Sequence, residues 1–148
     1  MKRIFTPVVP MIGLASLFAM GAVPNVQAES DEGCSNASLR GRYATWTDGT
    51  NVPEGTPVRS VGFATFDGEG NLSVTNTVNS NGTIIEQTFD AAYAVNDDCT
   101  GRIVDFADRH WVIAVMDEGK EVVFLRTDSN RVASGFYRKQ SSNRHEKK

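Results

Sequence analysis

Residues Val58–Val78, which read VRSVGFATFDGEGNLSVTNTV, contain the clearest fold signal of the chain. Its middle part, Asp67–Asn71, is typical of a tight hairpin, because its two glycines permit the positive φ that such turns need. In Leu72–Val78 every second residue is apolar or asparagine, and serine and threonine stand between them. Alternation with a period of two predicts a strand with one buried face, so Val58–Phe66 and Leu72–Val78 are expected to pair as antiparallel strands.

Short strands and turns continue on both sides of this hairpin. A longer loop with two prolines, Asp48–Pro57, precedes it. In Thr83–Val95, the residues Phe89, Ala91 and Tyr93 share one face, which is predicted to point inward. The further strands expected from the pattern are Leu39–Thr47, Thr83–Val95, Arg102–Phe106, His110–Met116, Glu121–Thr127 and Arg131–Lys139.

Eight short strands in succession predict an all-β protein with a single antiparallel meander. Eight such strands can close into a β-barrel, which removes exposed strand edges and leaves an interior for side chains or one small ligand. A two-sheet sandwich is the main rival, although the short turns leave little room for its long crossings. The barrel domain is expected over residues 29–139, and the polar residues 140–148 are predicted to be a disordered tail.

The first residues have the features of a secretory signal peptide. Lys2 and Arg3 are followed by an apolar run, and Val26-Gln27-Ala28 supplies small residues for cleavage after residue 28. The sequence therefore predicts a signal peptide over residues 1–28 and an exported protein, periplasmic or extracellular. Beyond this leader no apolar run is long enough to span a membrane. The chain carries a formal net charge of −3, which argues against a nucleic-acid partner.

Cys34 and Cys99 are the only cysteines of the chain. An even number in an oxidising compartment predicts one disulfide between them, which would stabilise the fold by about 4 kcal/mol. A redox role is disfavoured because there is no Cys-x-x-Cys. Two isolated cysteines also lack the clustering of a metal site, and no metal or cofactor is expected.

Several segments resemble a group of small exported, uncharacterised bacterial β-proteins. The opening Cys34–Tyr43, which reads CSNASLRGRY, resembles the start of these proteins, and Phe66–Asn71 resembles their first hairpin. Tyr93–Gly101 resembles their mid-chain turn with its second cysteine. The resemblance lends no catalytic residue and no substrate. The layout also resembles lipocalin-type and allene-oxide-cyclase-type barrels, in architecture alone.

Few residues could act in catalysis or metal binding, and each of them has a structural explanation. His110 stands alone at a strand start and is predicted to be a surface or hydrogen-bonded histidine. Asp97 and Asp98 lie in a turn and lack the spacing of a calcium loop. No serine lies in a Gly-x-Ser-x-Gly elbow, so no catalytic residue can be assigned.

The aromatic residues are the remaining candidates, since the core and the pocket of a small barrel share one space. Four of them are predicted to contact a ligand: Tyr43, Phe63, Tyr93 and Trp111. Charged residues within strands are expected to point outward, because burying a lone charge is costly. This expectation covers Arg42, Arg102, Arg126 and Glu86.

The sequence therefore favours a non-enzymatic binding module for a small apolar or amphipathic ligand, which would enter near the Asp48–Pro57 loop. Two alternatives stay open. One is a cofactor-free barrel enzyme of the cyclase or isomerase type, which would work by shaping its substrate. The other is a structural envelope or interaction protein that uses its outer face. An empty barrel centre would favour the binding module or the enzyme, and a filled centre would favour the structural protein.

Overall fold

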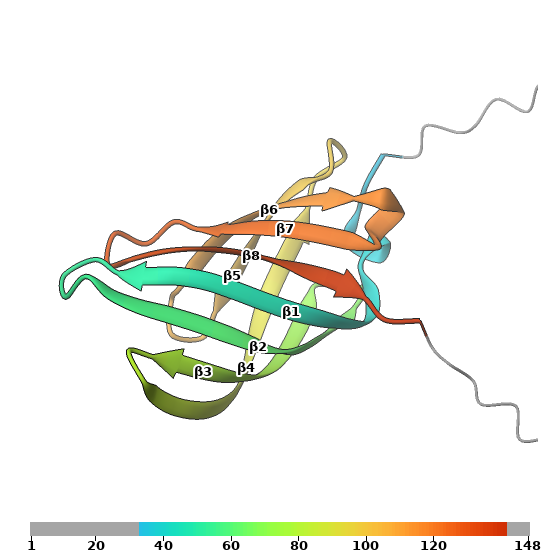
Figure 1. Cartoon of the computed structure of the whole chain (residues 1–148). Coiled ribbons are helices and arrows are strands. Elements are labelled where there is room, and N and C mark those ends of the chain that lie inside the picture. Colours follow the sequence, from blue (N-terminus) through green and yellow to red (C-terminus); the bar gives the residue numbers. More distant parts are fainter. Residues whose placement is uncertain (1–32, 142–148) are drawn as a thin grey trace, which may run out of the picture. The chain divides into compact units, whose positions relative to one another are not determined.

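The computed structural model describes residues 33–141, and the predicted signal peptide and most of the predicted tail lie outside them. The described chain consists of eight strands joined by short turns (Figure 1). The strands are β1 (Arg40–Asn51), β2 (Thr56–Asp67), β3 (Asn71–Ser80), β4 (Thr83–Val95), β5 (Thr100–Asp105), β6 (His110–Met116), β7 (Glu121–Arg126) and β8 (Arg131–Lys139). Two single turns of 3-10 helix, η1 (Asn36–Ser38) and η2 (Asp117–Gly119), are the helical elements of this part of the chain.

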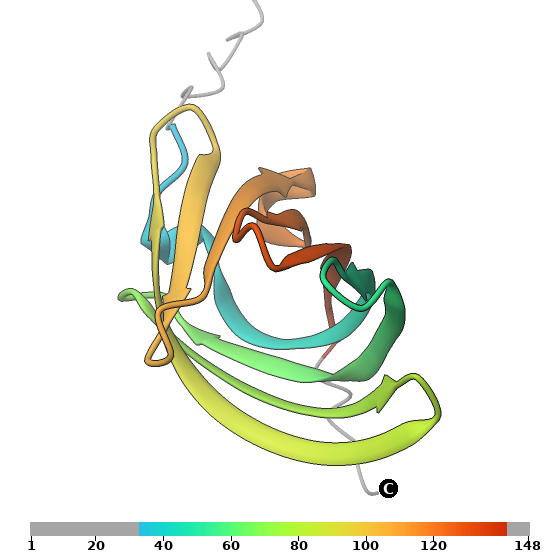
Figure 2. The same cartoon turned by 90° about the vertical axis from the view of Figure 1, so that its left-hand side faces the viewer.

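The strands form a closed barrel, as the sequence predicts. Each strand pairs antiparallel with the next in the chain, and β8 returns to pair with β1 from Tyr43↔Lys139 to Asn51↔Arg131. Figure 2 looks along the barrel and shows the strands curving around a common axis. A two-sheet sandwich is excluded, because the hydrogen-bonded ladder is continuous around the barrel.

The prediction of a long loop, Asp48–Pro57, between the first two strands is wrong. Both strands run further, and the connection shrinks to residues 52–55. The ladder continues to Asn51↔Thr56, and within it Asp48 lies opposite Arg59 and forms an exposed ion pair with it, with a distance of 3.2 Å between carboxylate and guanidinium. Pro57 is tolerated next to the turn, where its carbonyl accepts the Asn81 N–H at 3.0 Å.

One end of the barrel, called the closed end below, is filled by aromatic side chains. Phe66 lies at its centre and makes edge-to-face contacts with Tyr43, Tyr93 and Tyr137, with ring centroids 5.1 to 5.3 Å apart. Ala91 and Tyr93 are buried, which confirms the predicted inward face of β4. Each edge-to-face aromatic pair adds roughly 0.5–1.5 kcal/mol to the stability beyond its buried area.

The segment before β1 covers the closed end. Leu39 is fully buried there, and the Tyr93 hydroxyl donates to its carbonyl at 3.0 Å. The Asn36 side chain accepts the Val95 N–H at 2.8 Å. The predicted disulfide between Cys34 and Cys99 is present and ties this segment to the β4–β5 turn. Backbone, side-chain and covalent links thus fix the cover in place.

Glycine allows the strands to approach closely where β8 meets β1. A Cβ added to Gly135 would lie 2.0 Å from the Trp46 carbonyl oxygen and 2.6 Å from the Phe124 ring. Any larger residue would push the two strands apart. Gly135 therefore permits the curvature that closes the barrel.

Candidate functional site

The opposite end of the barrel, called the open end below, holds a cavity of about 70 Å³. The turns at this end are residues 52–55, 81–82, 106–109 and 127–130. The cavity therefore lies at the end where the sequence places the entrance, with Thr47 and Val58 on either side of the first turn among its lining residues. It has room for a few water molecules or part of a small ligand, and drug-sized pockets are larger, at roughly 300–1,000 Å³.

The cavity has both apolar and polar walls. Its apolar lining includes Val58, Val74, Val78, Phe89, Ile103 and Trp111. Its polar lining includes Thr45, Thr47, Ser60, Asn76, Gln87, Arg109, Arg126 and Arg131. A space of this mixed kind suits an amphipathic molecule better than a purely apolar one.

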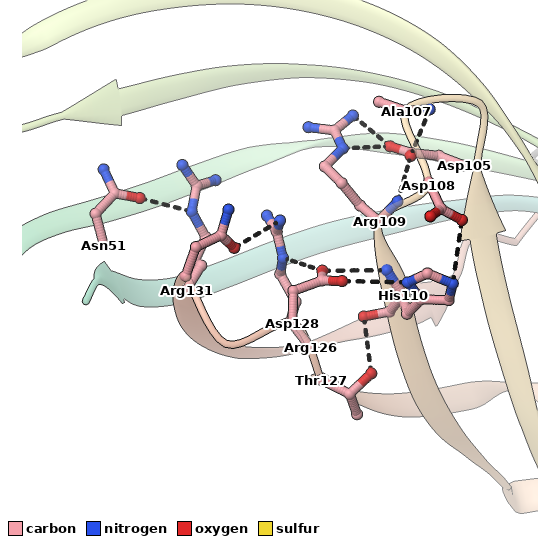
Figure 3. A network of polar contacts seen from close by, with 11 residues as sticks. Asn51, Asp105, Ala107, Asp108, Arg109, His110, Arg126, Thr127, Asp128 and Arg131 are labelled. Atoms are coloured by element: carbon pink, nitrogen blue, oxygen red, sulfur yellow. Dashed lines mark hydrogen bonds and ion pairs between the residues drawn. The ribbon is translucent and has the colours of Figure 1, made fainter. Parts of the chain in front are cut away.

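Three arginines reach this cavity, and we call them the arginine cluster: Arg109, Arg126 and Arg131 (Figure 3). Arg109 comes from the β5–β6 turn and forms an ion pair with Asp105 through two of its nitrogens. The Asp105 side chain is almost completely buried and also accepts the backbone N–H groups of Ala107 and Arg109. Both carboxylate oxygens of Asp105 are thus bonded to groups of the β5–β6 turn.

Arg126 is buried, with 8% of its surface exposed, so the expectation that it points outward is wrong. Its burial is possible because Asp128 follows two residues later and accepts its Nε–H at 2.7 Å. Asp128 also accepts the backbone N–H of His110 at 3.1 Å and faces the Nδ1 of that ring at 3.2 Å. Burial alone would raise the pKa of Asp128, but the hydrogen bonds from His110 and Arg126 hold that pKa below its ordinary value.

Arg131 differs from the other two arginines because it has no carboxylate partner among residues 33–141. Its Nε donates to the neutral side chain of Asn51 at 2.8 Å. Its pKa is lowered by burial and by the positive charges of Arg126 and Arg109. The arginine cluster therefore contains three guanidinium groups and two paired carboxylates, those of Asp105 and Asp128, which leaves one positive charge in excess.

Trp111 connects the charged and apolar parts of the site. The guanidinium carbons of Arg126 and Arg109 lie 5.7 and 6.0 Å from the centre of its ring system. Arg109 also lies 5.1 Å from the centre of the Phe89 ring. These distances are typical of cation–π interactions, in which the flat face of an aromatic ring lies next to a guanidinium group.

Asn76 provides a second polar group that is not fully used. Its Oδ1 is buried and has no hydrogen-bond partner in the described part of the chain, whereas its Nδ2 faces the Ser60 hydroxyl at 3.5 Å. An unpaired buried acceptor costs roughly 1–3 kcal/mol, so a donor that entered the cavity would be stabilised there.

Of the four aromatic residues predicted to contact a ligand, only Trp111 lines the cavity. Tyr43 and Tyr93 lie in the closed-end core, where they pack against Phe66. Phe63 lies on the outer surface, 42% exposed, with the Arg42 guanidinium 3.8 Å from its ring centre. The alternation along β2 already separates Phe63 from the buried Ala64 and Phe66.

The arginine cluster was missed because charged residues were expected to face outward. Alternation along the strands contained the signal. Arg126 shares a face with Val122 and Phe124, and Arg131 shares one with Ala133 and Tyr137. Consistent use of the period of two would have placed both arginines inside the barrel.

The other chemical candidates have structural roles. His110 is held between Asp128 and Asp108, with its Nε2 3.3 Å from the Asp108 carboxylate. Asp98 accepts the backbone N–H of Thr100 at 3.0 Å and its hydroxyl at 2.6 Å, as expected for a turn. Residues 33–141 contain no group of three or more His, Cys, Asp or Glu side chains placed to hold a metal ion. The same residues contain no helix that is both long and apolar enough to cross a membrane.

The outer face of the barrel carries an apolar row, which we define as Val61, Phe63, Trp46, Phe136, Val123 and Leu125. These residues lie on the neighbouring strands β2, β1, β8 and β7, in registers that place Trp46 opposite both Val61 and Phe136. The rings of Trp46 and Phe136 stack with centroids 6.0 Å apart. Five of the six side chains are exposed by more than a third of their surface.

No family model matches the chain, and no curated protein matches it. The solved structures that match include a redesigned β-barrel bound to DFHBI, with 15% identity and a TM-score of 0.45 over 70% of this chain and 97% of the other. They also include a de novo designed fluorescence-activating β-barrel, with 12% identity and a TM-score of 0.42 over 70% of this chain and 94% of the other. At TM-scores below 0.5 these likenesses carry no argument about function.

Proposed function

We propose that this protein is an exported, non-enzymatic binding module that takes one small amphipathic ligand into the open end of its barrel. The observation that carries the proposal is the cavity, where apolar walls meet an unpartnered amide oxygen and an excess guanidinium. The disulfide is compatible with export. The volume of about 70 Å³ limits the enclosed part of the ligand to a few heavy atoms.

The hydroxyls of Tyr43 and Tyr93, two of the three tyrosines, give no support to the enzyme alternative, whereas the third tyrosine, Tyr137, lines the cavity. A cofactor-free cyclase or isomerase would need polar groups that face its substrate. The Tyr43 hydroxyl instead donates to the Gly119 carbonyl at 2.6 Å, and that of Tyr93 donates to the Leu39 carbonyl. Both hydroxyls are thus bound to backbone at the closed end, away from the cavity.

Trp111 makes the proposal testable by fluorescence. The chain has two tryptophans, and Trp46 lies on the outer face, so Trp46→Phe leaves Trp111 as the only reporter. We expect small amphipathic compounds such as indole, phenol, butanol and benzoate to include at least one that changes Trp111 emission saturably at one site. We expect this binding because an apolar group that displaces poorly bonded water from a preformed cavity lowers the free energy of the system.

A pair of matched variants shows whether such binding uses the cavity. In the same background, Val78→Phe fills the cavity and should abolish binding, whereas Val61→Phe enlarges a side chain on the outer face and should leave binding unchanged. Thermal melts of both variants confirm that they fold. Equal binding by the two variants, or no binding by any compound, would contradict the proposal.

The apolar row supports a second candidate, a protein that works through its outer face. Exposed apolar surface of this kind marks many interaction sites. The same titration, together with a dilution series of the wild type, which keeps Trp46, separates the two functions. A folded protein that binds none of the small compounds, and in which Trp46 emission changes with protein concentration, would favour the outer face.

A further inference from the structure

The arginine cluster has more positive than negative charges. Asp105 is used by Arg109 and by its own turn, and Asp128 is shared between Arg126 and His110. Arg131 uses one N–H for Asn51, and its two terminal nitrogens have no acceptor within the described chain. A partly buried guanidinium is normally paired, because an unpaired charge away from water is costly. A group with negative charge is thus the missing partner.

We propose that Arg131, supported by Arg126, binds the carboxylate of a small organic acid whose short apolar tail lies against Trp111 and Phe89. This inference rests on the proposed function and specifies its ligand class. The free terminal nitrogens of Arg131 form the planar fork that matches a carboxylate. Arg126, whose side chain is only 6% exposed, adds fixed positive charge from deeper in the barrel.

The walls of the cavity favour an organic acid over an inorganic anion. Trp111 and Phe89 lie next to the guanidinium groups of Arg109 and Arg126. Val78 and Ile103 also line the cavity. A phosphate would fill this space with charge and leave the apolar walls without contacts. A carboxylate with a short tail satisfies both parts at once.

The cavity also limits the size of the acid. About 70 Å³ accommodates a tail of a few carbon atoms, so butyrate is a suitable probe. Its neutral analogue butyramide has nearly the same shape but lacks the charge, and butylamine carries the opposite charge. Butyramide can still accept one N–H of Arg131 but lacks the negative charge and the second acceptor oxygen, so butyrate should bind at least about tenfold more tightly than butyramide.

The experiment measures Trp111 emission in the full-length, exported Trp46→Phe protein during titration with butyrate, butyramide, butylamine and inorganic phosphate. We expect butyrate to bind most tightly and butylamine not to bind. Butyramide binding as tightly as butyrate would overturn the inference and leave the proposed function standing. Phosphate binding more tightly than butyrate would overturn the carboxylate assignment. No binding by any of the four compounds would overturn the inference alone where indole, phenol or butanol still binds, and would contradict both proposals where none of these binds.

Three variants locate the charge that is responsible. Arg131→Gln should reduce the ratio between butyrate and butyramide affinities to about one. Arg102→Gln removes the same charge from the outer face of β5 and should leave that ratio unchanged. Asn51→Asp places a carboxylate beside Arg131 and should abolish the preference without removing the arginine, which tests the inference even where Arg131→Gln folds poorly. A ratio that survives both Arg131→Gln and Asn51→Asp would overturn the inference.

Discussion

Arg126 and Arg131 lie in the same cavity, yet the structure places them in different electrostatic situations. Arg126 is buried beside Asp128, and its removal would leave that carboxylate with His110 alone. Within residues 33–141 the Arg131 side chain hydrogen-bonds only to the neutral amide of Asn51, and it is repelled by the charges of Arg126 and Arg109. A buried pair is costly to break by removing one partner, whereas an unpaired buried charge is itself unfavourable. The same substitution should therefore destabilise the fold at Arg126 but not at Arg131.

We expect Arg126→Gln to lower the free energy of unfolding by about 3 kcal/mol. Arg131→Gln should leave it unchanged within about 0.5 kcal/mol or raise it. Urea denaturation of the two variants and the wild type, in buffer without organic acids, measures the difference. A loss of stability at Arg131 as large as that at Arg126 would show that Arg131 has a partner in the free protein.

The β2–β3 hairpin is held by one carboxylate. Asp67 Oδ1 accepts the backbone N–H groups of Glu69, Gly70 and Asn71 at 2.7 to 3.0 Å. The side chain and backbone of Asn71, followed by the backbone of Glu69, lower the pKa of Asp67 to about 2. The turn was identified from its glycines, and the structure adds that the aspartate before them bonds to the turn backbone.

This hairpin should make stability depend on pH in a defined window. Because the pKa of Asp67 is lower in the folded than in the unfolded chain, its contribution is fully present above about pH 4 and is lost as pH falls towards 2. Asp67→Asn keeps the shape without the charge. We expect the difference in Tm between wild type and this variant to be largest above pH 4 and to shrink towards pH 2, as followed by circular dichroism. A difference independent of pH would contradict this explanation.

At the scale of the whole molecule, the sequence predicts the barrel well because the signals for it are local. Alternation along Leu72–Val78 and Thr83–Val95 and the turn chemistry between the strands act over a few residues, and the meander follows from their order. Boundaries were less accurate where pairing extends a strand past its apolar residues, as between Asp48 and Pro57.

The candidate site was harder to predict because it exists only after the barrel closes. Arg109, Arg126 and Arg131 come from a turn and two strands, and their convergence depends on the registers between β6, β7 and β8. Asp128 makes the burial of Arg126 possible, but nothing local shows that His110, far along the chain, shares that carboxylate. Charge balance inside a barrel is a property of the assembled molecule.

The disulfide acts at the same scale, because it joins residues separated by 65 positions and fixes the cover of the closed end. Cys99→Ser should lower the free energy of unfolding by about 2–5 kcal/mol, since it releases a large loop in the unfolded chain and frees the segment around Leu39. Mass spectrometry of the unreduced, exported protein should find no free thiol, and urea denaturation with and without reductant should reproduce the loss in the wild type. The cavity lies at the opposite end, so the response of Trp111 to butyrate should survive in the folded variant. Two titratable thiols in the natively exported protein, or equal stability of the oxidised wild type and Cys99→Ser, would show that packing and hydrogen bonds alone hold the cover of the closed end.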